Sequence, residues 1–231
     1  DNYIWMIAHE GRAAVVDPGD PTPVLKTLEE QGLALDTIII THHHFDHTGG
    51  VSALKKATGC RVIGPDNPKI ADIDETMIEG ARVTVLGYGF EIMEVPGHTL
   101  DHIAYYNAED GTLFCGDTLF VGGCGRVFEG TFPMMQQSLA KLSHLPCETK
   151  VYCTHEYTMA NLSFARKVEP TNADLSAHFD SCQKQRDNDL PTVPSTIGQE
   201  LLINPFLRWH SPAIIARLKQ EGRHTGDSPA D

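Results

Sequence analysis

The sequence lacks several features that would each define a class of protein. It has no apolar run long enough to cross a bilayer and no secretory signal pattern. Basic residues are scarce, with 18 Lys and Arg against 31 Asp and Glu, and the net charge of −13 argues against a basic, phosphate-binding surface. A G-x-S-x-G motif is absent, so no serine nucleophile is indicated. We therefore expect neither a membrane nor a nucleic acid as partner.

Cysteine is also scarce, with six in 231 residues and no C-x-x-C pair. This density is too low for a disulfide framework. We interpret the six cysteines as reduced thiols, mostly in the core, and expect a cytoplasmic protein. We also expect the chain to act as a monomer.

Length and composition indicate an ordinary globular protein, with 41% hydrophobic and 21% charged residues. A chain of 231 residues can bury a substantial core. Strand patterns with interspersed helices extend to about residue 156, and helical patterns follow. We predict an α/β domain over residues 1–156 and a small all-α domain over residues 157–231. The first residue is not methionine and the last residues are polar, so we expect a fragment trimmed at one or both ends.

Alternation and turn residues predict the individual elements. Strands are expected at residues 3–8, 13–17, 38–40, 61–64, 82–86, 90–95, 103–106, 112–115 and, as the last strand, 150–153. Helices are expected at residues 21–31, 51–57, 133–142, 157–168, 174–186 and 212–219. Residues 65–78 are polar and are expected to form a loop.

One stretch, residues 41–47, carries four histidines and an aspartate. It follows the apolar residues 38–40, which are typical of a buried strand, and precedes the helical pattern at residues 51–57. The stretch therefore joins the carboxyl end of a strand to a helix, where α/β sheets position their ligands.

Side chains alternate along an extended backbone, so His42, His44 and Asp46 would share one side, and His47 could reach the same point from the turn. Imidazoles and a carboxylate converging from one loop are suitable ligands for a divalent transition metal. One or two histidines would fit a solvated polar loop better, but four in six residues favour a metal site. His43 should point away from this site, and we interpret it as structural.

Three further strand ends each carry one candidate ligand, namely His98, Asp117 and His155. Alone, each would be interpreted as a cap or turn residue, but their recurrence at the same structural position indicates one composite site. Five histidines and two aspartates exceed one tetrahedral site, so we predict two metal ions with a bridging aspartate. Such a pair can activate water and polarise a carbonyl group.

The spacing His42-x-His44-x-Asp46-His47, with the later His98, Asp117 and His155, resembles the metallo-β-lactamase superfamily. That resemblance implies an αββα sandwich of two mixed sheets with helices outside. Within the superfamily the chain is most similar to the glyoxalase II (hydroxyacylglutathione hydrolase) family, including its helical tail. The supporting phrases are Asp1-Asn2-Tyr3-Ile4-Trp5, Val16-Asp17-Pro18-Gly19-Asp20, Pro96-Gly97-His98-Thr99, Phe114-Cys115-Gly116-Asp117-Thr118-Leu119-Phe120, Gly123-Cys124-Gly125-Arg126, Glu129-Gly130-Thr131, His155-Glu156-Tyr157-Thr158 and Asn204-Pro205-Phe206-Leu207-Arg208.

The resemblance implies a role for each candidate ligand. His42, His44 and His98 would hold one metal ion. Asp46, His47 and His155 would hold the second, with Asp117 as the bridge and both aspartates acting in catalysis. The family uses zinc, iron or manganese, and we expect zinc.

The resemblance also implies a substrate, S-D-lactoylglutathione, which the family hydrolyses to D-lactate and glutathione in methylglyoxal detoxification. Glutathione contacts would come from Arg126, Tyr157 and the backbone near Phe128. The alternative for Arg126 is a solvated loop residue, and for Tyr157 a packing residue between the domains is equally open.

The sequence departs from the family pattern at three places. Phe128 lacks a hydroxyl group that some members carry. Asp101 replaces a glycine between His98 and His102, where it could bond a ligand histidine or face solvent. The basic C-terminal helix of the family is missing before the chain stops at Asp231, which indicates truncation or weaker glutathione binding.

Three alternative functions remain open from the sequence. One is a glutathione persulfide dioxygenase, a mono-iron relative that uses part of the same ligands. Another is a different hydrolase of the superfamily, such as a lactonase or an RNA-processing phosphodiesterase, and the acidic composition disfavours the latter. A non-catalytic metal-binding module is the third, and the complete ligand set argues against it.

Overall fold

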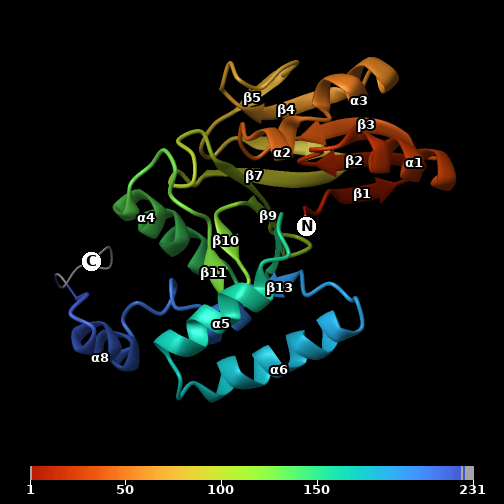
Figure 1. Ribbon diagram of the computed structural model, residues 1–231. Coiled ribbons are helices and arrows are strands. Elements are labelled where there is room, and N and C mark those ends of the chain that lie inside the picture. Colours follow the sequence, from red (N-terminus) through yellow and green to blue (C-terminus); the bar gives the residue numbers. More distant parts are fainter. Residues whose placement is uncertain (1, 225, 227–231) are drawn as a thin grey trace.

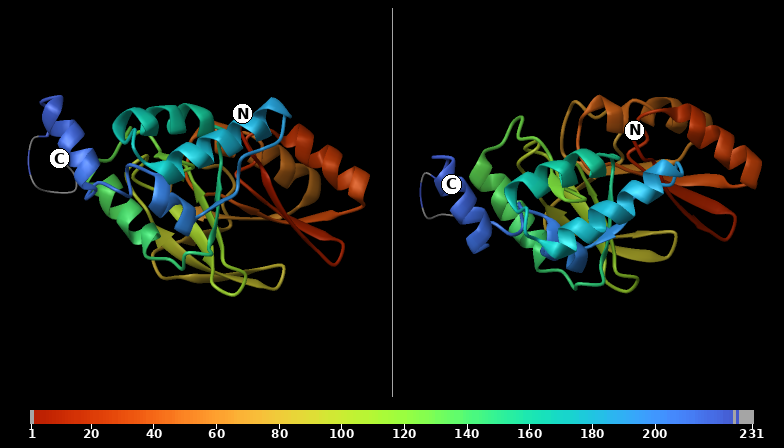
Figure 2. Two further views of the ribbon diagram at one scale, coloured as in Figure 1. Left: turned by 90° about the horizontal axis from the view of Figure 1, so that it is seen from below. Right: turned by 60° about the horizontal axis from the view of Figure 1, so that its bottom comes forward.

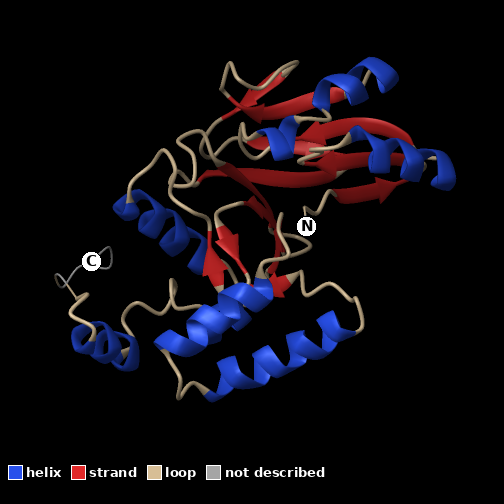
Figure 3. Ribbon diagram, viewed as in Figure 1, coloured by secondary structure: helices blue, strands red, loops and turns tan. Residues whose placement is uncertain are grey.

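The computed structural model describes residues 2–224 and 226 of the chain. Asp1 and the last residues of the predicted helical domain therefore lie outside the described residues. Two β-sheets lie face to face, with helices on their outer sides and a further group of helices at one end (Figures 1 and 3). The arrangement is the predicted αββα sandwich followed by helices.

The first sheet contains five strands in the order β1-β2-β3-β4-β5. These strands are β1 (Trp5–His9), β2 (Arg12–Val16), β3 (Ala34–Ile39), β4 (Arg61–Pro65) and β5 (Glu75–Met77). Only β1 and β2 pair antiparallel, so the sheet is mixed as predicted. The prediction of a loop at residues 65–78 is wrong in part, because β5 lies within this range. With three residues, two of them exposed, β5 is too short for alternation to reveal.

The second sheet contains six strands in the order β13-β12-β9-β8-β7-β6. They are β6 (Arg82–Val85), β7 (Tyr88–Glu94), β8 (Ile103–Asn107), β9 (Thr112–Gly116), β12 (Lys150–Cys153) and β13 (Ser195–Thr196). The expectation that residues 150–153 form the last strand is wrong, because β13 follows and pairs antiparallel with β12. A separate two-stranded hairpin, β10 (Leu119–Phe120) with β11 (Gly123–Cys124), was also not predicted. All three strands have two residues, below the length at which a pattern can be recognised.

Alternation along β2 shows why the sheets stack. Ala13 and Val15 pack into a cluster with the helices on the outer face, whereas Ala14 and Val16 pack into the cluster between the sheets. Because successive side chains point to opposite faces, a strand covered on both sides must be apolar throughout. Residues 13–16 are all buried, as a sandwich layer requires.

The helices outside the sheets are α1 (Pro21–Gln31), α2 (Phe45–Thr48), α3 (Val51–Thr58) and α4 (Phe132–Ser143). Three of them agree closely with the predicted positions, whereas the short helix α2 was not predicted. In α1 the Asp20 side chain accepts a hydrogen bond from the Thr22 N–H, and Gly32 ends the helix in the left-handed conformation. Helices α1 and α3 cover the first sheet, and α4 covers the second.

The remaining helices gather at one end of the sandwich, where α5 and α6 pack against each other (Figures 1 and 2). They are α5 (Thr158–Val168), α6 (Ala173–Asp187), α7 (Ile197–Ile203) and α8 (Pro212–Gln220). Leu162, Leu175 and Ile203 belong to a small core of their own. Helix α7 was not predicted, since seven residues after a proline-containing stretch give too little periodicity. None of the described helices is long and apolar enough to cross a membrane.

A buried carboxylate joins this helical end to the hairpin of β10 and β11. Glu200 of α7 is fully buried and accepts hydrogen bonds from the Gly122 N–H at 2.8 Å and the Asn204 amide at 2.9 Å. The Ser195 hydroxyl donates to its other oxygen at 2.5 Å. Burial raises the pKa of Glu200 from its ordinary 4.5 to about 7, although these hydrogen bonds lower it.

We expect Glu200→Gln to remove a pH dependence of stability. Between pH 4.5 and pH 7 the folded chain retains a proton on Glu200 that the unfolded chain releases, so the free energy of unfolding falls as pH rises. This loss is on the order of 3 kcal/mol. In the variant, the amide can donate to Ser195 while its oxygen accepts from Gly122, so the loss should disappear. Denaturant unfolding at about pH 4 and pH 8 measures the difference.

Glu148→Gln at an exposed position is the matched control, and it should follow the wild type. An equal loss of stability with pH in Glu200→Gln and in the wild type would contradict the assignment.

Candidate metal centre

The histidine loop follows β3 and ends in the short helix α2. His42 and His44 lie in the irregular segment before α2, and His44 has extended backbone angles of φ −60° and ψ 144°. The expectation that Asp46 shares this extended segment is wrong, because Asp46 and His47 lie in the single turn of α2. The helical turn still brings both side chains toward the same centre.

The other candidate ligands follow the carboxyl ends of three strands in the second sheet. His98 follows β7, Asp117 follows β9 and His155 follows β12. Strand β12 is parallel to β9, and β7 is separated from β9 by one antiparallel neighbour, so all three strands end at the same edge. At this edge Gly116 has φ +48°, and a Cβ atom there would lie 2.4 Å from the Thr41 hydroxyl. Glycine therefore permits the turn that directs Asp117 to the centre.

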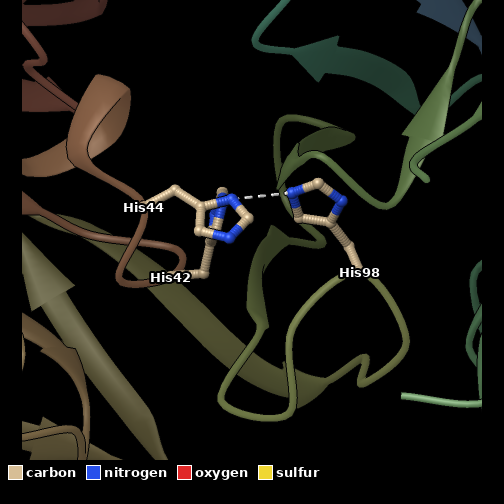
Figure 4. Close-up of side chains that lie close together, drawn as sticks. All are labelled: His42, His44 and His98. Atoms are coloured by element: carbon tan, nitrogen blue, oxygen red, sulfur yellow. Dashed lines mark hydrogen bonds between the residues drawn. The ribbon is translucent and has the colours of Figure 1, made fainter. Parts of the chain in front are cut away.

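The structure brings all seven predicted ligands together. The donor atoms of each of the following groups lie within 4.8 Å of one another: His42, His44 and His98; His42, His47 and Asp117; Asp46, His47 and His155. Figure 4 shows the first group, in which Nδ1 of His44 lies 3.0 Å from Nε2 of His98.

Asp117 lies between the two outer groups. Its Oδ2 is 3.5 Å from Nε2 of His98 and 3.1 Å from Nε2 of His155, and its Oδ1 is 3.5 Å from Nε2 of His47. Burial raises the pKa of Asp117, but the hydrogen bond with His155 and the nearby His47 imidazole outweigh burial and lower the pKa. The carboxylate is thus ionised and within reach of both groups.

Hydrogen bonds on the far side of three imidazole rings leave Nε2 available to a metal ion. Nδ1 of His98 donates to the Arg126 carbonyl at 2.7 Å, and Nδ1 of His47 donates to the Asp17 carboxylate at 3.0 Å. Nδ1 of His42 lies 3.1 Å from the Thr41 hydroxyl, which itself donates to Asp17 and therefore accepts from the ring. With Nδ1 protonated, the neutral rings of His42 and His98 present an Nε2 lone pair, and the His47 ring presents one once its second proton is released.

Unsatisfied buried atoms also fit a bound cation. Nε2 of His42, Nε2 of His47 and Oδ1 of Asp117 are buried without a hydrogen-bond partner. Burying a polar atom in this way is costly unless a ligand satisfies it. The fold and its cluster of histidines and aspartates therefore form a site for divalent metal ions.

The histidines differ in pKa, and therefore in whether a metal ion must displace a proton from the ring. Burial places the pKa of His42 well below its ordinary value and also lowers the pKa of His98. Burial lowers the pKa of His47 too, but Asp17 and Asp117 outweigh it and raise the pKa to about 10. A metal ion at His47 must therefore release a proton from this ring.

Two functional residues were not predicted from the sequence. Asp17 is buried at φ 52° and accepts three hydrogen bonds, two from Thr41 and one from His47. His102 is buried and its Nε2 accepts the backbone N–H of Asp117 at 3.1 Å. Burial lowers the pKa of His102 to about 3, which keeps this nitrogen an acceptor. Asp17 lies in a motif quoted for the resemblance, and His102 lies four residues after His98, but only the folded contacts reveal their partners.

The predicted substrate contacts lie around the centre. The Arg126 guanidinium lies 5.5 Å from the centroid of the Phe128 ring, which is 60% exposed and 5.3 Å from the His98 ring. On the other side, Tyr157 stacks on His155 at 4.7 Å and is 40% exposed. The two aromatic rings therefore flank the two outer donor groups.

The backbone amides of residues 128–130 are not available for a substrate. The N–H groups of Phe128 and Glu129 both donate to the His98 carbonyl, and that of Gly130 donates to Gly97. Any contact from the backbone of these three residues would have to use their carbonyl oxygens.

Comparison with known proteins first defines the class. The model of the Metallo-beta-lactamase superfamily matches residues 1–155, and the chain belongs to this superfamily. A structure described as TTHA1623 in a di-iron-bound form has a TM-score of 0.64 and 25% identity, covering 89% of this chain and 95% of the other.

The match then extends over the helical end. A model described as Hydroxyacylglutathione hydrolase C-terminus matches residues 156–230. Hydroxyacylglutathione hydrolases of Chromohalobacter salexigens and Ectopseudomonas mendocina are 51% and 53% identical, each over the whole chain and 91% of the relative. The chain thus belongs to the hydroxyacylglutathione hydrolase (glyoxalase II) family, as the sequence motifs indicated. The domain division at residue 156 and the individual ligand roles stay predictions.

Proposed function

We propose that the chain is a dinuclear-metal thioesterase that hydrolyses S-D-lactoylglutathione to D-lactate and glutathione. The observation that supports it best is the convergence of seven donor side chains on one centre, with Asp117 between two groups. Family membership supports the thioester as substrate.

We propose two ions per chain, with zinc as the metal and iron or manganese as alternatives. His42, His44 and His98 would hold one ion, Asp46, His47 and His155 the other, and Asp117 both. Imidazole with carboxylate suits zinc and iron alike, and a related fold has been described with two irons. When bound, two such ions lower the pKa of a water molecule and polarise the carbonyl group that it attacks.

Two carboxylate side chains, Asp46 and Asp117, would position the reacting groups. The Asp46 side chain is 52% exposed, whereas Asp117 is 8% exposed, so Asp46 faces the solvent side of the centre. We assign to Asp46 the orientation of the attacking water by accepting its hydrogen bond, and to Asp117 the fixed spacing of the two groups. Glutathione leaves as a thiolate, a good leaving group, so no acid is required near the sulfur.

We expect Arg126→Ala to raise KM about tenfold and to change kcat less than about threefold. The exposed guanidinium would pair with a glutathione carboxylate in the ground state and in the transition state alike, so its loss weakens binding without slowing the reaction. Steady-state kinetics on S-D-lactoylglutathione measures both constants. Arg82→Ala, at an exposed arginine that pairs with Glu91, is the control. A fall in kcat at unchanged KM would contradict this role.

Anaerobic hydrolysis of S-D-lactoylglutathione by the metal-loaded chain tests the proposed function. Release of D-lactate and free thiol in equal amounts, without oxygen, is the expected result. Oxygen consumption with a glutathione persulfide, and no thioester hydrolysis, would instead identify a dioxygenase. The cytoplasm as location and a monomeric state stay predictions. All six cysteines are free thiols, which fits a reducing compartment.

A further inference from the structure

A polar network lies beside the metal centre, and none of its residues is a proposed metal ligand. We define the Asp101 network as His43, Asn67, Lys69, Asp101 and Glu129. Its members come from four segments: the histidine loop, the connection from β4 to β5, the loop after His98 and the loop after Arg126.

The inner part of the network is buried. Oδ1 of Asp101 accepts a hydrogen bond from Nδ1 of His43 at 2.9 Å, and its Oδ2 accepts from the Asn67 amide at 2.8 Å. The side chains of His43 and Asp101 are only 8% and 10% exposed. Because Nδ1 carries the proton, Nε2 of His43 accepts from the Lys69 ammonium at 3.2 Å. Both ring nitrogens are thus satisfied.

The outer part is exposed and connects a further loop. Lys69 is 63% exposed and lies 3.4 Å from Glu129. The other oxygen of Glu129 accepts the Leu100 N–H at 3.2 Å, and the Glu129 N–H donates to the His98 carbonyl at 3.3 Å. Because exposed ion pairs contribute little, the buried Asp101–His43 pair should dominate the network.

A third metal site is the alternative interpretation, since donor atoms of His43, Asp101 and Glu129 lie within 4.8 Å of one another. The Lys69 ammonium already provides a cation between His43 and Glu129. Nδ1 of His43 is in turn occupied by Asp101. The geometry therefore favours a structural network over an ion site.

We propose that Asp101 is a positioning residue for the group His42, His44 and His98. His43 lies between His42 and His44 in the chain, and Asp101 follows His98 by three residues, so their hydrogen bond joins the two loops that supply all three ligands. It holds the loops at the spacing at which the His44 and His98 nitrogens approach to 3.0 Å. The inference rests on the proposed function, because it requires these histidines to hold a metal ion.

Asp101→Ala tests this role in the full chain. The buried Nδ1–H of His43 loses its acceptor, and we expect one of the two metal ions to be held about tenfold less tightly. We expect kcat to fall about tenfold while KM stays within about twofold, since His42, His44 and His98 would hold a metal ion needed for the reaction and do not bind glutathione. Asp101→Asn keeps an oxygen acceptor for His43 and should stay within about threefold of the wild type in both properties.

Chelator competition and steady-state kinetics measure these effects. Lys69→Ala, in the exposed outer part, should change either value less than about twofold. Asp74→Ala is the control for general destabilisation, because Asp74 also accepts two hydrogen bonds, from the Lys55 ammonium and the Val62 N–H, but belongs to none of the metal groups.

Wild-type metal retention and kcat in Asp101→Ala would overturn the proposal, as would an Asp101→Asn variant that is equally impaired. Equal weakening of both ions, accompanied by a loss of thermal stability that Asp74→Ala reproduces, would show a global effect and also overturn it. If the wild type hydrolyses no lactoylglutathione, the proposed function fails, whereas metal retention in Asp101→Ala still decides the positioning role.

Discussion

Asp117→Ala is expected to lower kcat/KM for S-D-lactoylglutathione by roughly a thousandfold or more, because loss of several kcal/mol of transition-state stabilisation has this effect. Asp117 lies within 3.5 Å of histidines from both outer donor groups. Without it, the two groups share no ligand and their spacing is no longer fixed.

Metal analysis of the same variant separates this cause from misfolding. We expect metal content to fall from two ions per chain toward one, with a far-ultraviolet circular dichroism spectrum like that of the wild type. Asp110→Ala, in the turn between β8 and β9, controls for the loss of an aspartate elsewhere and should be fully active. Wild-type turnover by Asp117→Ala would show that the bridge is assigned wrongly.

Asp17→Ala should be the most disruptive change outside the ligands themselves. Asp17 accepts from the Thr41 N–H at 2.8 Å, the Thr41 hydroxyl at 2.7 Å and His47 Nδ1 at 3.0 Å, all in the interior. Removing the carboxylate leaves buried donors unsatisfied, and we expect the metal-free chain to lose about 3 kcal/mol of stability. Metal affinity should fall about 10- to 100-fold, because His47 loses the bond that orients it and the Thr41 hydroxyl, which holds His42, loses its acceptor.

Asp17→Asn separates charge from shape. Asparagine tolerates the left-handed backbone at φ 52°, where alanine is strained. The asparagine variant should therefore recover part of the stability but little of the metal affinity. Denaturant unfolding of the metal-free chain and chelator competition give the two values. Unchanged stability and metal retention in Asp17→Ala would contradict the role assigned to this carboxylate.

The ligands could be predicted from the sequence because each follows the end of a recognisable strand. His98, Asp117 and His155 recur at the same structural position, and this recurrence survives errors of one or two residues in strand limits. The backbone conformation of the histidine loop was less well predicted, since Asp46 lies in the helical turn of α2 and not on an extended segment.

The supporting residues could not be predicted in the same way. Asp17 is 24 residues from Thr41 and 30 from His47, and His102 is 15 residues from Asp117, so their contacts exist only after folding. The role of Asp101 was open between solvent and a ligand histidine. The structure places it on His43, which is not a proposed ligand.

Short elements were missed for a related reason. β5, β13 and the hairpin of β10 and β11 have two or three residues each, and tertiary pairing forms them. Periodicity needs more residues than these strands contain.

Anomalous diffraction from crystals of the chain grown with zinc tests the central claim most directly. The account predicts two peaks per chain about 3.5–4 Å apart. One should lie among His42, His44 and His98, the other among Asp46, His47 and His155, with Asp117 touching both. A single peak, or peaks that avoid these side chains, would contradict it.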